Sequence, residues 1–171
     1  EGETIYDPIY NIFNKRYLID QVRSELKQMV KFSHESSLIV AALRTSVVNK
    51  ISDKQLVMIN RTISKLLLKT SRRSDVVAFV GNGVFSMLLK HTDQTNAVRA
   101  SERLADLMGQ SHFFMGDEEI SLDITIGISI LNIEKEAEQV IAEGLDAQES
   151  ADKDGHLVYQ VYGNDEPKGD L

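Results

Sequence analysis

The feature that most constrains this chain is a pair of apolar runs joined by Asn82 and Gly83. Residues 76–80 read Val-Val-Ala-Phe-Val and residues 84–89 read Val-Phe-Ser-Met-Leu-Leu. An Asn-Gly pair between two such runs predicts a β-hairpin, because a tight primed turn needs positive φ at both central residues. The predicted tip, residues 81–83, has no ionisable side chain. The charged groups lie where the hairpin begins, because residues 72–75 read Arg-Arg-Ser-Asp.

Hydrophobic periodicity extends this hairpin into an α/β domain. It predicts helices at residues 17–32, 52–70, 96–108 and 135–151, with a capping box at the start of the second and Gly109 as the stop of the third. Further strands are predicted at residues 37–43, 112–115, 120–131 and 157–161, whereas 7–16 and 44–50 are expected to form turns and a loop. We therefore expect a single-domain α/β fold, a three-layer sandwich in which a central, mixed and mostly antiparallel sheet of about five strands is flanked by helices.

Composition and charge exclude several classes of protein. The absence of cysteine removes disulfides and thiolate chemistry, and it fits a cytoplasmic protein. Residues 134–171 hold eleven acidic and three basic residues of a chain with net charge −7, which argues against nucleic-acid binding but not against a compact anionic ligand at a local basic patch. No apolar run reaches the roughly 20 residues of a membrane helix, so direct membrane insertion is not expected. Since the chain begins without Met, we expect the cytoplasmic part of a longer or membrane-tethered protein.

The histidines do not indicate a metal site. His34, His91, His112 and His156 are scattered along the chain, without an acidic or second histidine partner at ligand spacing. Each is therefore expected to be a surface or loop residue. Neither a metal nor a cofactor is predicted.

The order of these elements and three motifs resemble the GGDEF family, the diguanylate cyclase domains that condense two GTP molecules into cyclic di-GMP. Residues 7–16 are similar to the family's D-x-L-T-G-L-x-N-R-R segment, and residues 125–129 to its T-x-S-x-G-V-S strand. The tip, G-N-G-V-F at 81–85, stands where GG(D/E)EF is expected. The resemblance spans residues 7–162, so residues 1–6 are expected to be a linker from an upstream region and 163–171 a C-terminal tail or linker.

The same resemblance implies that catalysis is lost. Joining two GTP molecules requires divalent metal held by carboxylates, yet the family's acidic pair at the tip corresponds to Gly83 and Val84. The family's other metal, guanine and phosphate contacts fall on residues unsuited to those roles: Ala41 or Ala42, Arg44, Val57, Asp152 and His156. We therefore expect no diguanylate cyclase activity.

The family's inhibitory product site, by contrast, is implied to be retained. That site has an R-x-x-D motif five residues before the signature, and Arg72 and Asp75 stand at that spacing. A second arginine, in an A-E-R-I-R run, corresponds to Arg103. Guanidinium groups suit phosphate oxygens and the guanine O6/N7 edge, and a carboxylate can accept from guanine N–H groups. Arg73 and Arg99 are assigned supporting roles only.

Two hypotheses about function follow. In the first, the domain is a catalytically inactive receptor that binds cyclic di-GMP through Arg72, Asp75 and Arg103. The family often binds this ligand as a stacked pair, and such a pair would bridge two copies of the domain or reach an adjacent domain of the same chain. In the second, the domain binds no nucleotide and serves as a dimerisation or scaffold module for a neighbouring domain or partner protein. An Arg and an Asp three residues apart also form an ordinary salt bridge at a helix end, which keeps the second hypothesis open.

Overall fold

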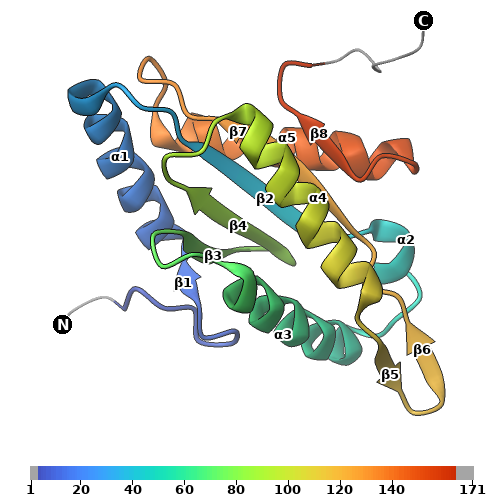
Figure 1. Cartoon of the computed structure of the whole chain (residues 1–171). Coiled ribbons are helices and arrows are strands. Elements are labelled where there is room, and N and C mark those ends of the chain that lie inside the picture. Colours follow the sequence, from blue (N-terminus) through green and yellow to red (C-terminus); the bar gives the residue numbers. More distant parts are fainter. Residues whose placement is uncertain (1–3, 165–171) are drawn as a thin grey trace, which may run out of the picture.

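A six-stranded sheet organises the computed structural model, which describes residues 4–164 (Figure 1). The strand order is β1-β3-β4-β2-β7-β8. The strands are β1 (Phe13–Asn14), β3 (Val76–Gly81), β4 (Val84–Leu89), β2 (Ser37–Leu43), β7 (Ile124–Ile130) and β8 (Tyr159–Val161). The four central strands pair antiparallel, while β1 and β8 are added in parallel at the two edges. The predicted mixed and mostly antiparallel sheet is confirmed.

The predicted hairpin is formed by β3 and β4. Asn82 and Gly83 have φ of 53° and 74°, the left-handed values that a primed turn requires. Phe79 pairs with Phe85, and the register then shifts by a bulge before Gly81 pairs with Val84. The tip therefore has the conformation that the Asn-Gly pair predicted.

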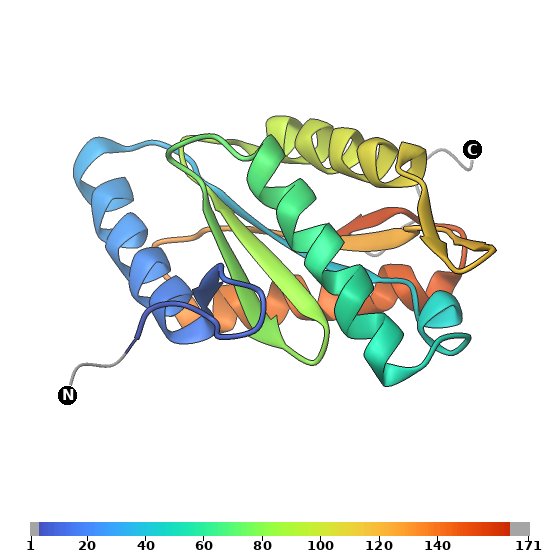
Figure 2. The same ribbon diagram turned by 90° about the horizontal axis from the view of Figure 1, so that it is seen from below.

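Helices cover both faces of the sheet, which gives the expected three layers. Helices α1 (Lys15–Phe32) and α5 (Ala137–Asp154) pack on one face, and α3 (Asp53–Thr70) and α4 (Gln94–Gln110) on the other, as Figure 2 shows for α4 and α5. The sheet thus separates two hydrophobic clusters, and β2 is buried on both faces. Ser52 and Gln55 form the predicted capping box at the start of α3.

One helix approaches its strand unusually closely. A Cβ atom added to Gly127 in β7 would lie 2.1 Å from the carbonyl oxygen of Gly144 and 2.3 Å from the backbone nitrogen of Gln148, both in α5. Glycine at position 127 therefore lets α5 lie directly against the sheet. None of the helices within residues 4–164 has both the length and the apolar character needed to cross a membrane.

Several predicted boundaries were wrong. Most of the expected strand 120–131 is β7, which joins the main sheet, but its first residue, Ile120, instead ends β6 (Glu118–Ile120). This short strand pairs with β5 (Phe113–Met115), within the strand expected at 112–115, in a separate two-stranded hairpin (Figure 1). The turn at Gly116, with φ of 64°, reverses the chain after three residues, so these short strands pair with each other. Helix α4 continues through Gly109 to Gln110, and Thr45–Val48 forms a short helix, α2, in the expected loop.

The N-terminal segment is also more ordered than predicted. Phe13–Asn14 forms β1 within a segment expected to consist of turns, and Tyr6 stacks on Phe13 with ring centroids 5.2 Å apart. The amide of Asn14 donates to the carbonyl of Thr4, so residues 4–6 of the expected leading linker contact the domain. Residues 1–3 of that linker and residues 165–171 of the expected tail lie outside the described residues.

Candidate functional site

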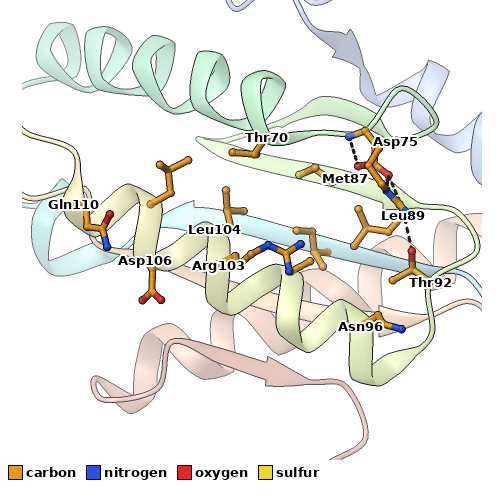
Figure 3. Close-up of a pocket in the computed structure, with 14 residues that line it drawn as sticks. Thr70, Asp75, Met87, Leu89, Thr92, Asn96, Arg103, Leu104, Asp106 and Gln110 are labelled. Atoms are coloured by element: carbon orange, nitrogen blue, oxygen red, sulfur yellow. Dashed lines mark hydrogen bonds and ion pairs between the residues drawn. The ribbon is translucent and has the colours of Figure 1, made fainter.

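A cavity of about 410 Å³ lies between α4 and the hairpin strands (Figure 3). Its apolar surface comes from strand residues such as Met87 and Leu89 and from the facing side of α4. Its polar groups come from the end of α3, the start of the hairpin, the turn between β4 and α4, and α4 itself: Thr70, Arg72, Asp75, Thr92, Asn96, Arg103, Asp106 and Gln110. The three residues of the predicted product site thus line one cavity.

Arg72 is held by Asp75 in a compact turn after α3. The backbone N–H of Arg72 donates to Asp75 Oδ2 over 2.8 Å, and its Nε and Nη2 donate to Oδ1 over 3.1 and 2.8 Å. The Asp75 side chain is 4% exposed, whereas that of Arg72 is 53% exposed. The Asp75 side chain is buried and accepts three hydrogen bonds from Arg72. Its main role is therefore to orient the guanidinium, and its own oxygens are largely shielded from solvent.

Arg72 is also tied to the turn between β4 and α4. Its Nη2 donates to the carbonyl oxygen of Lys90 over 3.1 Å and to Thr92 Oγ1 over 3.0 Å. Thr92 is itself fixed, since its carbonyl accepts a hydrogen bond from the buried Ser37 hydroxyl. The guanidinium is therefore preorganised at the wall of the cavity.

Arg103 reaches the same cavity from the other side. It is exposed on α4, and among residues 4–164 it has neither a hydrogen-bonding side-chain partner nor an ion pair. Figure 3 shows Arg103 extending from α4 along the cavity. Arg73 and Arg99 are exposed and do not line the cavity, so their supporting role stays a prediction.

Sequence reasoning missed the polar groups that complete the cavity wall. Thr92 supports Arg72, and Asn96 lines the cavity on the same helix as Arg103. The separation of Asn96 and Arg103 by seven residues, two helical turns, was the one signal that could have placed Asn96 on the same face as Arg103. Thr92 had no such signal, because its contact with Arg72 depends on how β3 and β4 pair.

At the end of β2 lie an internal ion pair and several hydrogen bonds. Arg44 is buried; its Nε donates to Asp123 Oδ2 over 3.0 Å, and its Nη2 donates to the carbonyl of Leu157 over 2.7 Å. At the start of α2, the backbone N–H of Thr45 donates to Asp152 Oδ1 over 3.0 Å, and the hydroxyl of Thr45 donates to the other oxygen of that carboxylate. Asp152 thus occupies backbone and hydroxyl donors that would otherwise be open to an anion.

Three of the histidines have partners that sequence reasoning did not anticipate. The rings of His34 and His91 stack with centroids 3.9 Å apart, and His34 Nε2 lies 2.7 Å from Glu25 Oε2. His112 Nδ1 lies 2.5 Å from Glu119 Oε2 across the β5–β6 hairpin. The expectation that no histidine had an acidic or histidine partner was therefore wrong, because chain folding brings together residues that are far apart in sequence.

Comparison with known proteins agrees with this architecture. The family model described as "Diguanylate cyclase, GGDEF domain" matches residues 4–156. The FimX GGDEF domain from Pseudomonas aeruginosa is 18% identical, with a TM-score of 0.80 over 93% of this chain and 99% of that one. The GGDEF domain of DgcB from Caulobacter crescentus, solved in complex with c-di-GMP, is 10% identical, with a TM-score of 0.82 over 95% of this chain and 96% of that one.

A third structure contains a protein partner. The diguanylate cyclase SiaD from Pseudomonas aeruginosa, solved in complex with its activator SiaC, is 20% identical, with a TM-score of 0.79 over 90% of this chain and 59% of that one. A search of curated proteins finds no match. The structural similarities establish the fold, and the family model covers most of the chain. This chain belongs to the GGDEF family of diguanylate cyclase domains.

Proposed function

We propose that this GGDEF domain is a receptor for cyclic di-GMP that does not synthesise the nucleotide. The observation that carries the proposal is the position of Arg72 and Arg103, which line the same cavity from the hairpin start and from α4. Arg72 is held in place by Asp75 and Thr92, so little conformational entropy remains to be lost at that contact on binding.

The chemistry of the cavity suits this ligand. Cyclic di-GMP has two phosphates and two guanines, and a guanidinium can form paired hydrogen bonds with a phosphate or with guanine O6 and N7. Met87 and Leu89 offer apolar surface for the faces of the guanine rings. The DgcB domain, of the same fold, was solved with c-di-GMP, which supports the choice of ligand class.

Loss of catalysis is the second part of the proposal. The positions that correspond to the acidic pair of the signature are Gly83 and Val84, which have no metal-binding oxygen in their side chains. Arg44 adds a buried cation at the end of β2. Asp152 adds a carboxylate that would repel a triphosphate. Each of these features removes or opposes a different contact that the binding of Mg²⁺-GTP requires.

A scaffold or dimerisation module without a nucleotide is the second candidate. It is favoured by the hydrogen bonds of Arg72 itself, since its Nε and Nη2 are satisfied by Asp75, Lys90 and Thr92 within the chain. In that case the R-x-x-D motif is a structural salt bridge that holds the hairpin to the β4–α4 turn. A cytoplasmic location and contacts with a second copy or an adjacent domain are compatible with both candidates.

Isothermal titration calorimetry with cyclic di-GMP tests the proposal. The informative variant is the double substitution Arg72→Ala/Asp75→Ala, because removing either partner alone leaves the other uncompensated. We expect saturable heat with the wild type and none with the double variant, while circular dichroism shows that both are folded. If neither protein gives saturable heat, only the scaffold function is left; if both give the same saturable heat, the ligand binds outside this cavity and the proposed site is refuted. In parallel, GTP incubated with Mg²⁺ or Mn²⁺ should give no cyclic di-GMP, and detectable product would refute the loss of catalysis.

A further inference from the structure

A second polar cluster lies where the end of α1 meets the turn between β4 and α4. Glu25 comes from α1, His34 from the segment after it, and His91 from the turn. Each residue offers one ligand atom, and these atoms all lie within 4.8 Å of one another. Among residues 4–164, no other group of three or more acidic, histidine or cysteine side chains brings its possible ligand atoms this close together.

Glu25 is the most buried member of the cluster, at 4% exposure. Its Oε2 accepts a hydrogen bond from Ser36 Oγ over 2.5 Å and lies 2.7 Å from His34 Nε2. No lysine or arginine of the described residues forms an ion pair with it. A carboxylate removed from water needs a compensating positive charge. Here the neighbouring imidazoles can either carry that charge themselves or bind a cation together with Glu25.

The two imidazoles are arranged face to face. Their planes differ by 21° at a centroid separation of 3.9 Å, and Nδ1 of His34 is buried without a hydrogen-bond partner. Two imidazolium ions at this distance would repel each other. Two neutral rings can instead direct one nitrogen lone pair each towards a shared cation, and the neutral ring is the form of histidine that binds metals.

The surrounding backbone holds the cluster together. Ser36 is fully buried, and its hydroxyl, which donates to Glu25, also accepts a hydrogen bond from the backbone N–H of His91 over 3.0 Å. His91 has φ of 54°, a left-handed conformation that is uncommon outside glycine and that points to a position fixed by its surroundings. One serine thus links the positions of two of the three ligand residues, as outer groups do in metal sites.

We propose that Glu25, His34 and His91 bind a divalent transition-metal ion of the zinc type. Two imidazoles and one carboxylate are a common ligand set for such ions and leave a fourth position for water, whereas Mg²⁺ and Ca²⁺ prefer all-oxygen sites. Zinc bonds of about 2.0–2.1 Å place tetrahedral ligand atoms about 3.3 Å apart. The pair Glu25 and His34 is already closer than this, and the exposed His91 can close on the ion by rotating its side chain.

Zinc titration of tag-free, chelator-treated protein tests this site, and its readouts do not depend on nucleotide binding. Calorimetry is expected to give one Zn²⁺ per chain, and Co²⁺ is expected to give the visible absorption band of a tetrahedral ion. His91→Asn should weaken Zn²⁺ binding by at least about 100-fold. Asparagine suits this substitution because it tolerates positive φ, so the turn is preserved while the imidazole is removed.

Two variants of other histidines serve as controls. His156→Asn removes an exposed histidine outside the cluster and should leave the titration unchanged. His112→Asn tests the exposed pair with Glu119 as an adventitious surface site, and it too should bind Zn²⁺ as the wild type does. The proposal is overturned if the wild type takes up no Zn²⁺, if His91→Asn binds as the wild type does, or if His112→Asn abolishes binding.

Discussion

Replacing Arg103 by alanine should abolish most of the affinity for cyclic di-GMP without affecting stability. Arg103 lines the cavity, is exposed, and has neither a side-chain hydrogen bond nor an ion pair within residues 4–164. Its removal therefore breaks no internal contact of that kind, and alanine has the highest helix propensity. We expect the free energy of unfolding to change by less than about 0.5 kcal/mol.

The expected loss of affinity follows from the contact that Arg103 would make. A charge-assisted hydrogen bond contributes about 1.5–3 kcal/mol. Loss of one such bond weakens binding by about 10- to 150-fold in Kd. A paired contact with guanine or phosphate would lose more.

Arg99→Ala is the matched control for this substitution. Arg99 is an exposed arginine of the same helix, one turn earlier, and it does not line the cavity. Removing it changes the net charge equally, so it measures long-range electrostatics together with the supporting role assigned to Arg99 from the sequence. At physiological salt the Debye length is about 8 Å, and we expect less than about a twofold change in Kd.

Calorimetric titration of the wild type and the two variants in one buffer measures both effects, with thermal melting as the check on folding. If Arg99→Ala weakens binding as much as Arg103→Ala, the ligand responds to overall charge rather than to this cavity. If the wild type binds and Arg103→Ala binds equally well, the cavity is not the binding site.

Two further predictions concern stability. In a urea titration, Gly127→Ala should destabilise the fold by about 3 kcal/mol or more, because the new Cβ meets the backbone of α5 at 2.1 Å. Gly109→Ala is the control: this residue lies in α4 with no atom within 4 Å of the added Cβ, so the substitution should be neutral or stabilising by up to about 1 kcal/mol. Arg72→Ala alone should cost about 1–3 kcal/mol, since it leaves the buried Asp75 without its cation, and the double variant Arg72→Ala/Asp75→Ala should be more stable than the single one. A stable Gly127→Ala, or a double variant less stable than Arg72→Ala, would contradict these interpretations.

The parts of the fold that could be predicted are those with local signals. The turn at Asn82 and Gly83 depends on the φ values of two adjacent residues, and the cap of α3 on Ser52 and Gln55 within one turn. Strand β2 was readable as a continuous apolar run because both of its faces are buried. By contrast, β1 is only two residues long and exists because it pairs with β3, which no pattern in its own segment reveals.

The two candidate sites differ in the same way. Arg72 and Asp75 could be paired from their spacing, since both lie in one turn, and Arg103 was placed by its resemblance to a family motif. The contact of His34 with His91 requires the segment after α1 to lie beside the β4–α4 turn. That proximity results from the antiparallel pairing of β2 with β4, in which Ser37 lies opposite Leu89. A site assembled by sheet register has no signature in linear spacing.

Acidic residues placed at the hairpin tip alone should not turn this domain into a cyclase. In the double substitution Gly83→Asp/Val84→Glu, the carboxylates return to the hairpin, although position 83 has φ of 74° and strains any side chain.

The rest of a metal-nucleotide site would still be missing, because the tip supplies only part of such a site. The buried Arg44 remains paired with Asp123 at the end of β2, and it would repel Mg²⁺. Asp152 still occupies the N–H of Thr45 and would repel the triphosphate. We therefore expect no cyclic di-GMP from GTP and Mg²⁺ by chromatography, even with the tip restored. Turnover by this variant would show that the tip alone had silenced the enzyme, and that Arg44 and Asp152 are compatible with catalysis.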